Sequence, residues 1–158
     1  MNKPINIGVR KGARIIMDDN CLITINGTME QHGESDSIEL KTRGSFTKKN
    51  NAFFISYKES EATGYKGCMT TVKVEDTGTC VSMLRFGSAP SQLVIEKGTR
   101  HVCHYETGHG ALSLGVSADE IENGLSETGG TVKFSYMLDS DTTSISRNTV
   151  NITVKPLN

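Results

Sequence analysis

Tryptophan is absent from this chain of 158 residues, and aromatic residues make up only 6% of it. Proteins that hold single-stranded nucleic acid stack its bases on aromatic side chains, so this scarcity counts against such a function. Charge of one sign is also lacking, because 17 lysines and arginines stand against 18 aspartates and glutamates. Nucleic-acid-binding domains are usually strongly basic, with a pI above about 9. We therefore expect no nucleic-acid partner.

Long apolar runs are missing as well. No stretch approaches the roughly 18 apolar residues of a membrane-spanning helix, and no apolar segment follows the N-terminal charges as in a signal peptide. We expect no membrane association and a cytoplasmic location. The four cysteines form no C-x-x-C pair. In a reducing compartment they are expected to stay free thiols, with no zinc ribbon and no disulfide.

The usual signatures of catalysis are absent too. The sequence contains no nucleophile elbow, no phosphate-binding loop, no dinucleotide-binding fingerprint and no H-E-x-x-H motif. Gly108-His109-Gly110 lacks the lysine and the helix that follow a phosphate-binding loop. These absences favour a protein that is not an enzyme, and they predict no cofactor.

Residue types typical of β-strands are abundant. Thr, Val and Ile total 39 residues, whereas Leu and Ala, which favour helices, total 15. β-Branched side chains pack well on a pleated sheet and lose rotamer freedom in a helix. Gly clusters separate the apolar runs, as hairpin turns require, and the three prolines lie near the termini or in a connection. The composition predicts an all-β protein.

Alternating apolar and polar residues place the strands. They predict strands over 21–29, 37–47, 53–59, 69–75, 79–86, 91–96, 99–106, 111–117 and 131–139, and a last strand that ends at Val154. Lys49-Asn50-Asn51 is one of several turn signals between them. Short hairpin connections produce an antiparallel meander, and closure of a long meander removes its exposed edges. We expect an up-and-down β-barrel of about eight to ten strands; the alternative is a two-sheet sandwich.

Two places break the alternation. Ser117–Gly124 has the residue spacing of a helix start and a glycine stop, but it is only about two turns long. We expect a strand or a single turn there. In the last strand Ile145 has the wrong parity for the residues that lead to Val154, and a bulge near Arg147-Asn148 would restore it.

Residues 1–20 differ from the rest and are expected to form an N-terminal arm, with residues 21–158 as one barrel domain. The arm carries several basic residues, and its Ile5, Ile7 and Val9 alternate. Two alternatives to a loosely attached arm remain. In the first, Met17 is the natural start of the protein and the residues before it are an upstream extension. In the second, the segment is a mitochondrial-type presequence, which its lack of serine disfavours.

Polar residues at inward-facing positions supply the candidate site. They are Tyr57, Glu59, Arg85, His101, Tyr105 and Tyr136. If they converge, a carboxylate, a guanidinium and several phenols point into one barrel, and Glu59 and Arg85 are candidates for an ion pair because buried charges need partners. One interpretation is a ligand cavity with apolar walls and a few polar groups. The other is a structural hydrogen-bond network that seals one end of the barrel.

A metal site is the weaker interpretation of the nearby histidines. His101 and Cys103 project from one strand face and His109 lies in the next turn, so zinc could find three ligands there. The spacing matches no standard zinc signature, and we therefore predict no metal.

Motif order also indicates a family. The pattern runs Tyr57-x-Glu59, Gly67–Val74, Arg85-x-Gly87, Tyr105-x-Thr107-x-x-Gly110 and Tyr136-x-Leu138-Asp139. It resembles the YwiB-like family of small uncharacterised bacterial proteins, from about Cys21 to Lys155. The resemblance implies a calycin-type, broadly lipocalin-like β-barrel and no established activity. The chain departs from the family pattern in its N-terminal arm and in His109, which stands where a proline–aromatic pair is expected.

Three functions follow as hypotheses. The first is a cytoplasmic binding module whose cavity holds a small polar or anionic molecule, with Arg85 gripping a carboxylate or phosphate. The second is a structural or interaction protein that acts through its surface or as a homo-oligomer, such as a homodimer, and needs no ligand. The third is an enzyme that uses Glu59 as an acid or base beside Tyr105 or His101.

Overall fold

The computed structural model describes residues 19–107, 110–140 and 143–157. These residues form ten strands and one 3₁₀ turn, η2. The elements are β2 (Cys21–Gln31), β3 (Glu34–Lys49), β4 (Ala52–Lys58), η2 (Glu61–Thr63), β5 (Met69–Glu75), β6 (Cys80–Phe86), β7 (Ser91–Glu96), β8 (Arg100–Thr107), β9 (Gly110–Ser126), β10 (Gly129–Ser140) and β11 (Thr143–Pro156). Residues 1–18, most of the expected arm, and His109 lie outside the described residues.

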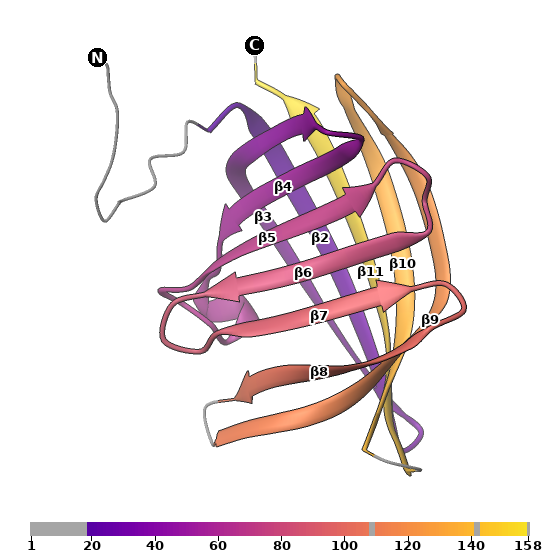
Figure 1. The fold of residues 1–158 in the computed structure, drawn as a ribbon. Coiled ribbons are helices and arrows are strands. Elements are labelled where there is room, and N and C mark those ends of the chain that lie inside the picture. The colour runs from indigo at the N-terminus through magenta and orange to yellow at the C-terminus, as the bar shows by residue number, and fades with distance from the viewer. Residues whose placement is uncertain (1–18, 108–109, 141–142, 158) are drawn as a thin grey trace.

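The strands close into one antiparallel barrel. Neighbours in sequence are neighbours in the sheet, and β11 pairs with β2 to complete the ring. The predicted all-β, up-and-down barrel is therefore confirmed, and the two-sheet sandwich is not formed. Figure 1 shows β4 to β7 crossing in front of β2, β10 and β11.

Turn chemistry fits the short connections. Asn50 and Asn51 both adopt positive φ angles, 53° and 65°, between β3 and β4. Asparagine tolerates this left-handed conformation, which the two central residues of a type I′ hairpin turn require. The turn predicted at Lys49-Asn50-Asn51 is therefore present.

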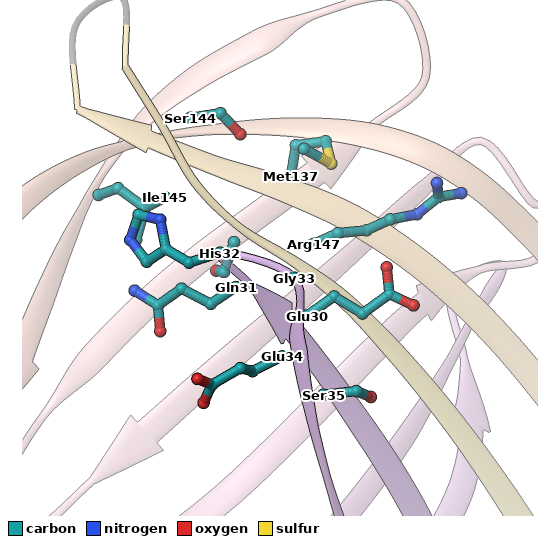
Figure 2. A pocket seen from close by; sticks show the side chains of 11 residues that line it. Glu30, Gln31, His32, Gly33, Glu34, Ser35, Met137, Ser144, Ile145 and Arg147 are labelled. Atoms are coloured by element: carbon teal, nitrogen blue, oxygen red, sulfur yellow. The ribbon is translucent and has the colours of Figure 1, made fainter.

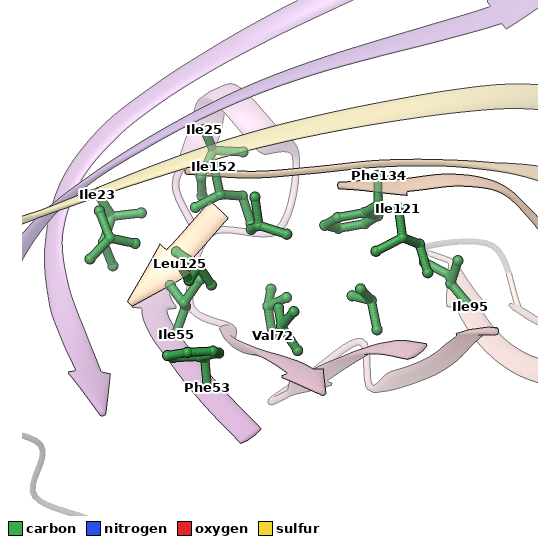
Figure 3. Packing of buried hydrophobic residues seen from close by; sticks show 14 of the residues in the cluster. Ile23, Ile25, Phe53, Ile55, Val72, Ile95, Ile121, Leu125, Phe134 and Ile152 are labelled. Carbon is green, nitrogen blue, oxygen red and sulfur yellow. The ribbon is translucent and has the colours of Figure 1, made fainter. Parts of the chain in front are cut away.

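Apolar side chains fill the interior. Buried valines, isoleucines and phenylalanines from all around the ring form one cluster, with Phe134, Ile23 and Ile55 among its fully buried members. Figure 3 shows these side chains pointing toward one another between the strands. Burial of such residues is the main favourable contribution to folding. This packing confines open space to the ends of the barrel.

Bulges explain the two breaks in alternation. Ser117–Gly124 lies within β9 as a strand, and Asp119 is the extra residue where the pairing with β10 shifts. In β11 the shift falls at Ile145, between the pairs that Ser146 and Ser144 make with β10. The expected bulge near Arg147-Asn148 is thus present but two residues earlier. Each bulge returns the next residues to the correct face.

One seam of the barrel is thin. β7 and β8 share a single ladder pair, Ser91 with Tyr105, and a bridge at their turn between Glu96 and Thr99. Between these points the backbone N–H of Val94 donates to the Cys103 thiol, 3.4 Å away. The seam is therefore held at its two ends, and side chains replace part of the backbone ladder.

Helices play almost no part in this structure. Within the described residues, no helix has the length and apolar character that a membrane crossing needs.

Candidate functional site

All four tyrosines of the chain gather at one end of the barrel. Tyr57, Tyr65, Tyr105 and Tyr136 come from four different segments of the sequence, and each interacts with another of the four or with Arg85. Arg85 itself is only 8% exposed. This end carries the connection between β6 and β7, at the left in Figure 1. We refer to these five residues as the tyrosine–arginine cluster.

Strand alternation places most of the cluster. Tyr57 follows Phe53 and Ile55 on the inner face of β4, and Tyr136 follows Phe134 on β10. Tyr57 and Tyr136 are 5% and 7% exposed. The same period of two that builds the core thus continues into polar residues where the core ends.

Tyr65 reaches the cluster by a different route. The loop after β4 contains η2, in which Ser60 forms a reciprocal capping box with Thr63. Gly64 ends the turn with φ 85°, a left-handed conformation that glycine adopts without steric cost. The chain then reverses and lays the Tyr65 ring against the Arg85 guanidinium, whose carbon lies 3.5 Å from the ring centroid.

Arg85 is held by neutral groups. Its Nε donates to the carbonyl of Ala89 at 2.5 Å, and one Nη donates to the carbonyl of Glu106 at 2.6 Å. The Tyr105 ring lies on another side, 5.1 Å from the guanidinium carbon. Among the described residues no carboxylate forms an ion pair with Arg85. The result is a buried guanidinium that is held by neutral groups and has no carboxylate in ion-pair contact among the described residues.

The expected Glu59–Arg85 ion pair is therefore not formed. The Glu59 carboxylate instead accepts a hydrogen bond from the Thr70 hydroxyl. Both side chains nevertheless line the same space, so the structure brings the two charges together without joining them.

Two phenol groups differ in their partners. The Tyr65 and Tyr105 hydroxyls lie 3.1 Å apart and share a hydrogen bond. The Tyr136 hydroxyl makes no hydrogen bond to another described residue, and it is not among their buried unpaired atoms, so its oxygen is open to the space that Tyr136 lines. A phenol hydroxyl is both a donor and an acceptor, so at the cavity wall it is available to a bound molecule.

A small cavity lies inside the cluster. Its volume is about 80 Å³, which corresponds to roughly three water molecules at the volume each occupies in the liquid. We call it the inner cavity; it is lined by Glu59, Thr70, Met83, Arg85, Ser91, Leu93, Tyr105 and Tyr136.

Tyr105 and Tyr136 also line a second, larger cavity of about 360 Å³ at the mouth of the barrel. We call this one the outer cavity. The two cavities adjoin at these two rings.

Burial keeps the phenols protonated. Desolvation is the largest cause that raises the pKa values of Tyr57 and Tyr136, with the Glu59 charge adding to the effect at Tyr57. Desolvation and the hydrogen bond with Tyr105 raise the pKa of Tyr65 to about 12. At neutral pH these groups are hydrogen-bonding phenols and not bases, which suits recognition of an acceptor.

Alkaline pH is expected to destabilise the fold through these phenols. The unfolded chain releases the Tyr65 proton near pH 10.0, whereas the folded chain holds it to about pH 12. The contribution to stability is therefore complete below about pH 10 and is lost as the pH rises toward 12. Urea unfolding across this range should give a free energy of unfolding that falls with pH, less steeply in Tyr65→Phe. Equal slopes in the two proteins would contradict this assignment.

The remaining predicted residues lie elsewhere. His101 is not among the residues that line either cavity, and its Nε2 lies 2.8 Å from the Glu96 carboxylate across the turn between β7 and β8. Cys103 accepts the hydrogen bond from Val94. His109, the third candidate zinc ligand, lies outside the described residues. Among the residues described, no group of three or more His, Cys, Asp or Glu has metal-binding geometry.

A third hollow, of about 520 Å³, lies at the tips of the β2–β3 and β10–β11 hairpins. In Figure 2 the side chains of Gln31 and Glu34 extend away from those of Glu30 and Arg147. Arg147 is paired with Asp119. The polar groups of this hollow do not converge, so the tyrosine–arginine cluster is the better candidate site.

The sequence pattern did not identify Tyr65 or Thr70 as site residues. Tyr65 lies in a loop, where alternation carries no information about direction. A signal was nevertheless present, because the chain has only four tyrosines and the other three already occupied inward positions. Thr70 is buried at 3% exposure at the start of β5.

The fold and the cluster together define a closed ten-stranded antiparallel β-barrel with a polar cavity at one end. Residues 23–152 match the family described as a domain of unknown function, DUF1934, and the chain belongs to this family.

Two comparisons agree with this assignment. The uncharacterized beta-barrel protein YwiB of Bacillus subtilis (strain 168) is 27% identical over 112 residues, which cover 71% of this chain and 76% of YwiB. The crystal structure of the B. subtilis ywiB protein superposes with a TM-score of 0.75 at 22% identity. The superposed region covers 89% of this chain and 93% of the ywiB chain. The resemblance to YwiB-like proteins is thus confirmed, and at this identity the structural match concerns the fold alone.

Proposed function

We propose that this protein is a binding module whose inner cavity holds the anionic group of a small molecule against Arg85. The single observation that carries the proposal is a guanidinium buried to more than nine-tenths without a carboxylate partner among the described residues. A buried unpaired charge is costly, and a bound anion would offset that cost. Arginine also presents donors in a fixed fork that suits a carboxylate or phosphate.

The surroundings of Arg85 support binding over a sealed structural network. The Tyr136 hydroxyl lines the inner cavity without a hydrogen bond to another described residue, so it is available to a bound molecule. The mouth of a β-barrel is also a common place for small-molecule sites. The raised phenol pKa values favour recognition over acid–base catalysis, because protonated tyrosines donate hydrogen bonds but do not remove protons.

A homodimer without a ligand has less support. Among the more exposed apolar side chains are Val102, at 69%, and Leu112, at 50%. Val102 pairs with Gly115 and Leu112 with Tyr105, so they lie on opposite faces of the β8–β9 hairpin and make no single apolar patch. A cytoplasmic location belongs to the proposal, since a reducing compartment suits four free thiols.

Native mass spectrometry tests this function. We expect the protein purified from cells to carry extra mass that disappears on denaturation, and Arg85→Met to lose it. Charge-assisted hydrogen bonds contribute about 1.5–3 kcal/mol, so affinity should fall by roughly 10- to 150-fold.

Tyr136→Phe is the matched variant, because Arg85 also holds two backbone carbonyls and its loss lowers stability. Removing a hydroxyl without a protein partner should leave the unfolding free energy nearly unchanged and still weaken binding by about tenfold. Full retention of the ligand in both variants would overturn the proposal, and so would a purified protein that carries no ligand and whose melting temperature carboxylates and phosphates leave unchanged.

A further inference from the structure

The outer cavity has a chemical character opposite to that of the inner one. Its lining includes the apolar side chains of Met29, Ile38 and Val150 together with the Tyr65 ring. Met29 and Ile38 are 38% and 42% exposed although they continue the inward-facing rows of β2 and β3. Gly27 pairs with Ile38 across these strands and lines the same cavity. Large apolar side chains left uncovered inside a barrel mouth mark a surface that binds apolar groups.

Charge divides the two cavities further. Among the residues that line the outer cavity the only charged side chain is the acidic Asp36, and there is no arginine or lysine. An anionic group entering this space would be repelled, whereas Arg85 attracts it into the inner cavity. A bound acid would therefore place its anionic end inward and its remaining part outward.

The residues of the inner cavity also indicate which chemical group the ligand carries next to its anionic group. Arg85 offers donors, whereas the Glu59 carboxylate, which lines the same small space, is an acceptor. A ligand with a simple carboxylate would accept hydrogen bonds from Arg85, but its negative charge would face the negative charge of Glu59. A hydroxyl or ammonium group on the neighbouring carbon would donate to Glu59 and remove this conflict. A volume of about 80 Å³ leaves room for such a head group and little more.

We infer that the ligand is an organic acid with a hydroxyl or amino group next to its carboxylate and an aromatic or branched apolar side chain, with the head in the inner cavity and the side chain in the outer cavity. This inference rests on the proposed anion-binding function and specifies its ligand. Tyr105 and Tyr136, which line both cavities, would contact the molecule where head and side chain meet.

Titration calorimetry with the full chain tests the inference with four probes. Racemic 3-phenyllactate has the whole pattern, lactate lacks the apolar group, 3-phenylpropionate lacks the hydroxyl, and phenylalanine replaces the hydroxyl by an amino group. Burial of a phenyl group is expected to make 3-phenyllactate or phenylalanine bind about 10- to 100-fold more tightly than lactate. Loss of the donor should weaken 3-phenylpropionate by about tenfold.

Two matched variants assign the apolar part to the outer cavity. Ile38→Ser should remove most of the advantage of 3-phenyllactate over lactate. Leu22→Ser removes a side chain of similar exposure, 41%, from a position on β2 that lines neither cavity, and should leave the advantage intact.

The possible results distinguish the proposed ligand class from anion binding at Arg85 itself. Equal affinities for lactate and 3-phenyllactate, both lost in Arg85→Met, would overturn the ligand class and leave anion binding in place. Absence of binding by all four probes, in a protein that retains an Arg85-dependent native mass increment, would do the same. Binding of 3-phenyllactate that Arg85→Met leaves unchanged would overturn both.

Discussion

Gly44→Ala is expected to lower the free energy of unfolding by about 3 kcal/mol or more, or to prevent folding. A Cβ atom at this position of β3 would overlap the backbone oxygen of Ser56 and lie within 2.5 Å of Ile23 Cδ1. The oxygen belongs to the neighbouring strand and cannot turn away as a flexible side chain would. The same glycine carbonyl accepts hydrogen bonds from Asn20 N–H and the Cys21 thiol, so a shift of β3 would disturb these contacts too. Urea unfolding measures the loss.

Gly27→Ala is the control for this substitution. Gly27 faces the same side of the sheet from β2, and its added Cβ would make an ordinary contact of 3.4 Å with Ile38. Neither glycine needs a positive φ angle, so the pair isolates steric overlap from backbone strain. We expect Gly27→Ala to change stability by less than about 1 kcal/mol. Similar losses in both variants would show that the overlap at Gly44 is not what matters.

Phe134→Ala is expected to cost about 3–5 kcal/mol, as truncation of a fully buried aromatic side chain does. Phe134 is 0% exposed and the largest of the fully buried side chains. It lies opposite Ile121 of β9 and Val150 of β11, and its ring stacks on Tyr136 with centroids 6.3 Å apart. The strands around it are hydrogen-bonded into a closed ring and cannot move inward to fill the space.

Phe86→Ala makes the same chemical change at an exposed position. Phe86 is 55% exposed at the end of β6. Its loss should change the unfolding free energy by no more than about 0.5 kcal/mol. Thermal or urea denaturation of the two variants compares them directly. A Phe134→Ala protein as stable as Phe86→Ala would mean that the barrel interior can relax around the missing ring.

Much of the fold was predictable because one face of every strand is buried. Alternation along Val132, Phe134 and Tyr136, or along Phe53, Ile55 and Tyr57, reports which way each side chain points. Glycine and asparagine clusters marked the hairpins. The bulges were less well located, because Asp119 and Ile145 shift the pairing by one residue and the sequence shows only that parity changes nearby.

The site was harder to predict than the fold, because parity gives a direction and no partner. Four of the predicted residues do converge, namely Tyr57, Arg85, Tyr105 and Tyr136. The predicted partner of Arg85 was Glu59, whereas the structure shows two backbone carbonyls and two tyrosine rings around it. His101 shares the parity of Tyr105 but lies four residues earlier on β8. A residue rises about 3.3 Å along a strand, so His101 is at the far end of the seam, beside Glu96.

Because β2 and β11 are the first and last strands of the barrel in chain order, the ring closes only after the ribosome has released β11. Until then β2 presents an eleven-residue edge whose partner has not been made, and β10 presents another. In the folded protein β2 and β11 lie side by side, joined from Cys21 with Pro156 to Glu30 with Arg147 (Figure 1). Open edges of this kind template pairing with other chains. Synthesis that stalls before residue 143 would therefore release a chain that can associate through these edges.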